Sequence, residues 1–270
     1  MVEVTMKELL EAGVHFGHQT NRWNPKMERF IYGKRNGIYI IDLAKTQEEL
    51  TRSLKYIEDS VANGKVPVIV STKKQAQDII EEEAQKGGAY YVNVRWLGGL
   101  ITNFHTIKKS IDKLKEYQAM KEDGRWDKLN KKEQSKLEKV YKKLYKNLNG
   151  VKDLEGIPDF LIVIDTERED IAILEAKKKG IPIVGVVDTN GDPDIIDYPI
   201  PGNDDAIRSI KLFASKFVDA IIEGKRRKLE AETVPLNEEE GETSETEVVS
   251  EKTKKSNDNS EKEETTKEEK

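Results

Sequence analysis

Apolar residues along this chain are grouped in a way that predicts alternating strands and helices. Five short apolar runs are predicted strands, at 38–41, 66–71, 90–92, 160–165 and 183–187. Amphipathic segments separate them, and one carries Leu50, Leu54, Ile57 and Val61 on a single helical face. Strands that are apolar on both faces and alternate with helices are typical of a parallel sheet covered on both sides. The pattern predicts a doubly wound α/β fold with a mostly parallel sheet of about five strands.

Capping residues predict where the helices begin and end. Thr5 with Glu8 is typical of a capping box, and Gly13 is expected to end this first helix. Later helices are predicted to begin at Thr46, Thr72, Thr166 and Asn203 or Asp204, and to end at Gly64, Gly87-Gly88, Gly180 and Gly224. The last helix is expected to bury Ile207, Ile210, Ala214, Phe217 and Ile221. Residues 15–26 fit neither pattern and are predicted to form an irregular loop.

Residues 105–152 show a different periodicity. Apolar residues recur there at steps of four and three, at Ile107, Ile111 and Leu114 and then at Leu137, Tyr141, Leu144 and Leu148. Residues 123–127 interrupt the pattern. We predict an antiparallel helical hairpin, coiled-coil in character, inserted into an α/β body made of 1–104 and 153–229.

Charge is distributed unevenly over these parts. The 270 residues carry a formal net charge of −5, but 105–152 hold 15 basic and 7 acidic residues. Residues 230–270 hold 15 acidic and 6 basic residues and few apolar ones, so a disordered acidic tail is predicted. The basic excess therefore lies on the projecting hairpin, which favours a polyanionic partner.

Cysteine is absent, which excludes disulfides and thiolate chemistry. No apolar run approaches the roughly 18 residues needed to span a bilayer, and the first residues lack the apolar core of a signal peptide. We expect a cytoplasmic protein.

Motifs for catalysis are missing. The patterns G-x-G-x-x-G, G-x-x-x-x-G-K-[ST] and G-x-S-x-G do not occur. Asp165 and Asp188 follow predicted strands, and Asp204 lies in a later loop, so these carboxylates could converge at one edge of the sheet. Asp188 and Asp204 are the candidate ligands for a structural Mg²⁺, and no other cofactor is predicted. The alternative is that these carboxylates only cap helices and turns.

His15 and His18 stand three residues apart and could both bind one metal. Hydrogen-bonded histidines or RNA contacts are the simpler interpretation.

Two loops combine arginine with tryptophan, at Arg22-Trp23 and Arg95-Trp96. Guanidinium and indole groups stack on unpaired bases, whereas lysine and asparagine reach phosphates and 2′-hydroxyls. The composition favours recognition of RNA shape and backbone. The predicted RNA-binding residues are Arg22, Trp23, Asn24, Lys26, Lys34, Arg35, Arg95, Trp96, Asn103, His105, Lys108, Lys109 and Arg125.

Several longer motifs carry a family resemblance. They are Leu9 to Gln19, Arg22 to Met27, Arg95 to Gly99, Thr102-Asn103-Phe104, Asp188-Thr189-Asn190 and Ile200 to Ala206. This sequence closely resembles the bacterial form of the second protein family of the small ribosomal subunit, from about residue 5 to residue 224. The acidic tail lies outside the resemblance.

The resemblance implies a structural ribosomal protein without catalytic activity. It also implies binding to small-subunit ribosomal RNA where the head, body and platform meet. Members of the family help to hold the first protein of the small subunit, which engages messenger RNA. Two other functions stay open from the residues alone: a Mg²⁺-dependent phosphotransfer or hydrolytic enzyme that uses Asp165, Asp188 and Asp204, and an adaptor whose hairpin docks another protein.

Overall fold

The computed structural model describes residues 4–257, and the side chains of residues 4–233. The chain forms two compact units, Met1–Lys225 and Arg226–Lys270. Among the described residues, every helix is too short or too polar to cross a membrane.

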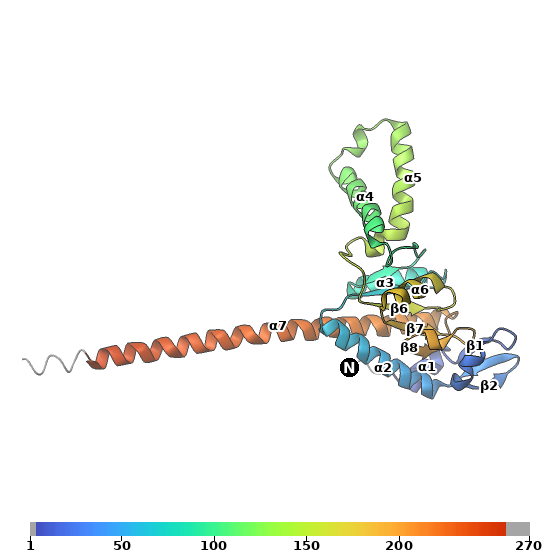
Figure 1. The fold of residues 1–270 in the computed structure, drawn as a ribbon, viewed down its shortest axis with the longest axis horizontal. Coiled ribbons are helices and arrows are strands. Elements are labelled where there is room, and N and C mark those ends of the chain that lie inside the picture. The colour runs from blue at the N-terminus through green and yellow to red at the C-terminus, as the bar shows by residue number, and fades with distance from the viewer. Residues whose placement is uncertain (1–3, 258–270) are drawn as a thin grey trace, which may run out of the picture. The chain divides into compact units, whose positions relative to one another are not determined.

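A five-stranded parallel sheet forms the centre of the first unit, as the alternating pattern predicted (Figure 1). Its strands follow the order β5-β4-β6-β7-β8. Their bounds are Pro67–Val70 for β4, Tyr90–Val92 for β5, Phe160–Ile164 for β6, Ile183–Val187 for β7 and Tyr198–Pro201 for β8. All residues of β4, β6 and β7 are buried, which is why these runs are apolar on both faces.

Each face of the sheet has its own hydrophobic core. Along β6, Phe160, Ile162 and Ile164 point into one core, and Leu161 and Val163 into the other. Helices α1 (Met6–Ala12), α2 (Leu43–Ala62), α3 (Gln77–Gly87) and the first part of α7 (Ile207–Asn257) cover the first face. Helix α6 (Asp170–Lys179) and the base of the hairpin cover the second.

The structure corrects which strands make up the sheet. The predicted strand at 38–41 is β3 (Ile38–Ile41), and it lies in a separate antiparallel sheet of order β1-β3-β2, with β1 at Phe16–Gln19 and β2 at Ile31–Arg35. The fifth parallel strand is instead β8, which the sequence analysis missed. Two prolines argue against a strand there, but β8 lies at the sheet edge, where missing N–H donors are tolerated. Residues 15–26, predicted to be irregular, contain β1 and the start of the 3₁₀ helix η1 (Pro25–Phe30).

Helix α1 has the predicted capping box, and Gly13 ends it with φ of 73°. Three other predicted starts are wrong by three to four residues. Helix α2 begins at Leu43, because the Asp42 side chain accepts the Ala44 backbone N–H at 3.0 Å and makes Asp42 the N-cap. Thr46 is buried inside the helix and donates its hydroxyl to the Pro201 carbonyl at 2.8 Å. Helices α3 and α6 begin later than Thr72 and Thr166 predict.

Helix α7 runs past its predicted end at Gly224. A Cβ at Gly224 would lie only 2.7 Å from the Glu58 carbonyl oxygen of α2, so this glycine permits close packing of two helices and does not end one. Ile207, predicted to be buried, is 60% exposed. The predicted disorder of 230–270 is not confirmed: α7 continues to Asn257, and 258–270 lie outside the described residues.

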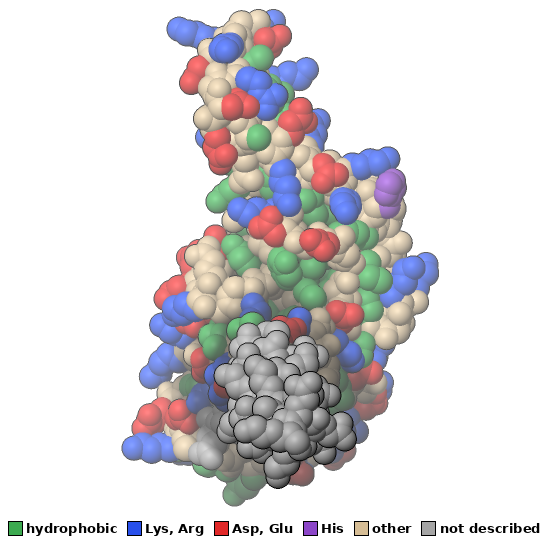
Figure 2. Space-filling model, turned by 90° about the vertical axis from the view of Figure 1, so that its left-hand side faces the viewer, with side chains coloured by type: hydrophobic (Ala, Val, Ile, Leu, Met, Phe, Trp, Pro, Cys, Tyr) green, Lys and Arg blue, Asp and Glu red, His purple; other side chains and the backbone are tan. Residues whose placement is uncertain are grey.

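The basic insertion forms the predicted helical hairpin and stands out from the body of the first unit (Figures 1 and 2). It consists of α4 (Phe104–Glu122), η2 (Trp126–Lys128) and α5 (Lys131–Leu148), followed by η3 (Asn149–Val151). Ile111, Leu114 and Leu148 join the second core, so the base of the hairpin is part of the body. Coiled-coil packing along its length stays a prediction.

Candidate functional site

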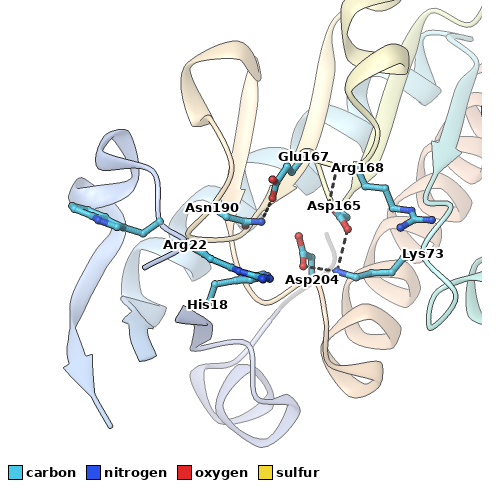
Figure 3. Close-up of a pocket in the computed structure, with 9 residues that line it drawn as sticks. His18, Arg22, Lys73, Asp165, Glu167, Arg168, Asn190 and Asp204 are labelled. Carbon is cyan, nitrogen blue, oxygen red and sulfur yellow. Dashed lines mark hydrogen bonds and ion pairs between the residues drawn. The ribbon is translucent and has the colours of Figure 1, made fainter. Parts of the chain in front are cut away.

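A cleft lies at the carboxyl ends of β4 and β6. After β4 the chain continues to β5, at one edge of the sheet, whereas after β6 it continues to β7, towards the opposite edge. Doubly wound folds bind ligands at such a switch point, because the diverging connections leave a crevice. The cleft has a volume of about 730 Å³ (Figure 3). Its lining residues are His18, Arg22, Trp23, Lys73, Asp165, Glu167, Arg168, Asn190 and Asp204.

Lys73 forms ion pairs with three carboxylates at this cleft. Its Nζ lies 2.7 Å from Asp204, 2.7 Å from Asp205 and 3.0 Å from Asp165. Burial alone would lower the pKa of Lys73, but the adjacent Asp204 and its neighbours raise it above the ordinary lysine value. Burial, and then the charges of Asp188 and Asp165, raise the pKa of Asp204 to about 8. A catalytic acid or base is not needed to explain this cluster.

His18 connects β1 to the same cluster. Its Nδ1 lies 3.1 Å from an Asp188 oxygen, and its Nε2 lies 3.3 Å from an Asp205 oxygen. The contact with Asp188 raises the pKa of His18 to about 9. The close approach depends on Gly17, because a Cβ there would lie 2.5 Å from the Thr189 methyl group. The Thr189 hydroxyl in turn accepts the His18 backbone N–H at 2.9 Å.

The two predicted metal ligands lie together, with a third group beside them. Ligand atoms of His18, Asp188 and Asp204 all lie within 4.8 Å of one another. An imidazole with two carboxylates suits Zn²⁺ better than Mg²⁺, which prefers oxygen ligands only. His15, the other predicted partner of His18, lies against Phe16 with ring centroids 4.0 Å apart and the rings tilted by 39°, and it is not in this group.

Trp96 is buried, with only 6% of its surface exposed, so its ring packs within the protein, and its predicted contact with RNA stays a prediction. Its Nε1 donates to Glu175 of α6 at 3.2 Å. The same carboxylate accepts the backbone N–H groups of Gly99, Ile101 and Thr102 at 2.7 to 3.1 Å, and the Thr102 hydroxyl at 2.9 Å. This motif therefore holds a loop against α6. Sequence analysis missed Glu175, since nothing in the local pattern of α6 distinguishes it.

Other predicted RNA-binding residues are engaged within the protein. Lys26 pairs with Asp192 at 2.7 Å, and Asn24 accepts the Lys26 backbone N–H at 3.1 Å. Arg125 pairs with Asp123 at 2.6 Å. The Trp23 ring lies 5.0 Å from that of Tyr39 and lines the cleft, and Asn103 accepts the Thr106 hydroxyl at 3.1 Å.

The remaining predicted residues are exposed. They have no ion pair among the described residues, and they are Arg22, Lys34, Arg35, Arg95, His105, Lys108 and Lys109. They lie on separate elements: the cleft rim, the end of β2, the loop after β5 and the first turns of α4. Of these seven residues, only Arg22 lines the cleft described above.

Comparisons with known proteins place the chain in a family. The family model of ribosomal protein S2 matches residues 9–224. The small ribosomal subunit protein uS2 of Koribacter versatilis is 58% identical over 224 residues, which cover 83% of this chain and 74% of that protein. The uS2 protein of Coprothermobacter proteolyticus is 56% identical over 225 residues, 83% of this chain and 84% of that protein. The chain belongs to the ribosomal protein S2 family.

Proposed function

We propose that this protein binds small-subunit ribosomal RNA through its hairpin and its exposed basic loops. As a member of the ribosomal protein S2 family it has a structural role in the ribosome and is not an enzyme. The strand-end carboxylates Asp165, Asp188 and Asp204 therefore do not support the alternative of a Mg²⁺-dependent enzyme. Within the protein these carboxylates pair with Lys73 and His18.

The observation that carries the proposal is the unbalanced charge of the hairpin. Of the 15 basic residues in 105–152, only Lys115, Lys121, Arg125 and Lys142 form ion pairs among the described residues. The others are left for an external anion. RNA phosphates are the anions that a structural ribosomal protein meets, and their neutralisation releases counterions, which drives binding.

We place the protein at the junction of head, body and platform, in the cytoplasmic ribosome, where it helps to hold the first small-subunit protein. The support for this finer placement is the family and the names of the relatives, which are small-subunit proteins. Co-sedimentation of the tagged protein with small subunits through a sucrose gradient tests it. Recovery only in the ribosome-free fractions would overturn the proposal, as would subunits that lack this protein yet keep the first protein bound.

Direct RNA binding is tested by filter binding in rising salt. Each phosphate contact adds about 0.7 to 0.9 to the slope of log affinity against log salt concentration. A hairpin that uses six contacts or more should give a slope of about 4 or steeper. A flat response with purified small-subunit RNA would contradict the proposal and favour the adaptor function.

A divalent cation at His18, Asp188 and Asp204 is a separate proposal. A metal there would displace the proton that the neighbouring carboxylates hold on His18. Thermal unfolding in EDTA, Mg²⁺ and Zn²⁺ tests it, with Asp188→Asn as the control variant. The proposal fails if neither ion raises the unfolding temperature of the unchanged protein.

A further inference from the structure

The lysines of α5 form a line along one face of the helix. Lys132, Lys136, Lys139, Lys143 and Lys146 follow one another at steps of four, three, four and three. At 3.6 residues per turn these steps keep all five within about 40° of one line. Every one of them is exposed and has no ion pair among the described residues. We call this set the α5 lysine row.

The row lies opposite the apolar seam of the hairpin. Leu137, Tyr141, Leu144 and Leu148 lie about 150° around α5 from the row, and all four are buried or half-buried. Packing of the seam against α4 and the body therefore fixes which way the row points. The lysines face away from the protein that carries them.

The row is free of acidic residues. Helix α5 has only two, Glu133 and Glu138, which lie about 100° and 120° from the centre line of the row. Glu138 pairs with Lys121 of α4 at 2.8 Å. It also pairs with Lys142 of its own helix at 3.7 Å. Glu133 stands three residues before Lys136 but forms no ion pair with it among the described residues.

Helix α4 offers no comparable surface. Its exposed residues mix both signs, with Asp112 and Glu116 between Lys109, Lys113 and Lys115. Figure 2 likewise shows blue and red side chains side by side on the visible face of the hairpin, at the top of the view. Uniform positive charge is a property of the outer face of α5 and not of the hairpin as a whole.

We propose that the α5 lysine row is the surface along which the hairpin holds an RNA phosphate backbone. This rests on the proposed function and names its contact surface. The row is about 21 Å long, at 1.5 Å per residue. Duplex nucleic acid carries one phosphate per strand about every 3.4 Å, so each lysine can meet a different phosphate. Lysines act as point charges on flexible stems, so the row grips the backbone without reading the base sequence.

A membrane surface does not fit the same face. Helices that bind lipid present a broad apolar face beside their cationic one. The exposed apolar residues of α5, Val140 and Tyr145, lie on opposite flanks of the row, roughly 80° and 140° away. Ser135 and Asn147 border the row instead. The α5 lysine row therefore suits a polyanion and not a membrane surface.

The test compares three variants of the full chain. In the row variant all five lysines are changed to glutamine, which has nearly the same helix propensity and removes only charge. A charge-matched control changes five exposed, unpaired lysines of the body: K55Q, K65Q, K74Q, K178Q and K179Q. A second control changes the row to arginine, which keeps the charge. Circular dichroism checks that each variant is folded.

Filter binding to purified small-subunit RNA should separate the variants. The row variant should lose about 3.5 to 4.5 from the salt slope and at least about 100-fold in affinity at 0.1 M salt. The arginine variant should bind as the unchanged protein does. The body variant should lose less than about tenfold, since it changes only the net charge.

The possible failures are distinct. If the unchanged protein does not bind RNA in a salt-dependent way, the proposed function fails. If it binds and the row variant binds equally well, RNA is held elsewhere and this inference is overturned. A row variant that keeps its RNA affinity but no longer sediments with small subunits would assign the row to an acidic protein partner, which also overturns it.

Discussion

At the scale of single residues, one buried carboxylate fixes the loop that carries Arg95 and Trp96. Glu175 accepts hydrogen bonds from three backbone N–H groups and two side chains. Burial alone would raise the pKa of Glu175, but these donors together lower it below its ordinary value. Gly99 completes the loop, because its φ of 93° is one that other residues rarely adopt.

Glu175→Gln should destabilise the protein by about 3 kcal/mol at pH 7, because the new amide cannot accept the same set of donors. A group with a lowered folded pKa stabilises above its unfolded pKa and loses that effect as pH falls through the folded value. The difference between the two proteins should therefore shrink below about pH 4.5. Urea unfolding at pH 7 and pH 4 measures it. If Glu175→Gln lowers the free energy of unfolding equally at pH 7 and pH 4, the charge of Glu175 is not the cause of the loss.

His18 should make stability fall as pH rises. Its folded pKa of about 9 lies above its ordinary value of 6.5, so its contribution is complete below pH 6.5 and is lost as pH rises through 9. The groups facing it are Asp188, Asp204 and Asp205, with Lys73 beyond them. Asp204 also has a raised pKa and acts in the same direction.

His18→Gln should therefore cost on the order of 1 kcal/mol at pH 6 and much less at pH 9.5. Thermal unfolding of both proteins across this range provides the measurement. His15→Gln is the matched control: its side chain lies outside the carboxylate group, and burial lowers its pKa. A His18→Gln effect that does not change with pH would contradict the ion pair.

Neither the carboxylate group around His18 nor the contact between Glu175 and the Trp96 loop could be predicted in full from the sequence. Asp188 and Asp204 were recognised because they follow strands or lie in nearby loops. Their partner His18 lies 170 residues before Asp188, and the folded chain holds it there through the bond from its backbone N–H to Thr189. The hydrogen bond from Trp96 to Glu175 is not predictable for the same reason, since Glu175 looks like an ordinary helical glutamate in the sequence.

At the scale of elements, glycine has two uses that sequence alone does not separate. Gly88 and Gly180 end helices with positive φ, as predicted. Gly224 instead lies within α7, where its missing side chain lets α7 approach the backbone of α2. The apolar periodicity before Gly224 gives no sign of which use applies.

Gly224→Ala should lower the free energy of unfolding by about 1 to 3 kcal/mol, although alanine is the better helix former. A Cβ there would lie 2.7 Å from the Glu58 carbonyl oxygen and 2.8 Å from the Val61 Cβ, so α2 and α7 would have to move apart. Gly156→Ala is the control, because a Cβ at that position meets nothing within 4 Å. Urea unfolding compares the two. A neutral or stabilising Gly224→Ala would refute the packing role.

At the scale of the whole molecule, the hairpin is an insertion with a base that is buried in the body and a distal half that is exposed or half-buried. Removal of 105–152 in thought leaves the strand order of the body unbroken, which is why the fold class was predictable from alternation alone. Yet Ile111, Leu114 and Leu148 belong to the same buried core as β4 and β6. The periodicity predicted the hairpin but not how deeply its base enters the body, since seam residues look alike along its length.

Two deletions should separate these parts. Replacing 119–137 with a short glycine-containing turn removes the distal half, whose residues are exposed or half-buried, and should leave the body nearly as stable as before. Replacing 105–152 also removes Ile111, Leu114 and Leu148, each worth about 2 to 5 kcal/mol when a buried side chain of this size is lost. Those losses together come to about 6 to 15 kcal/mol, which is as large as the usual stability of a domain, so this variant should be largely unfolded. Urea unfolding, followed by circular dichroism, measures the stability of both deletion variants. A cooperative, stable body without 105–152 would show that the base only rests on the core, and the hairpin would then be an independent arm.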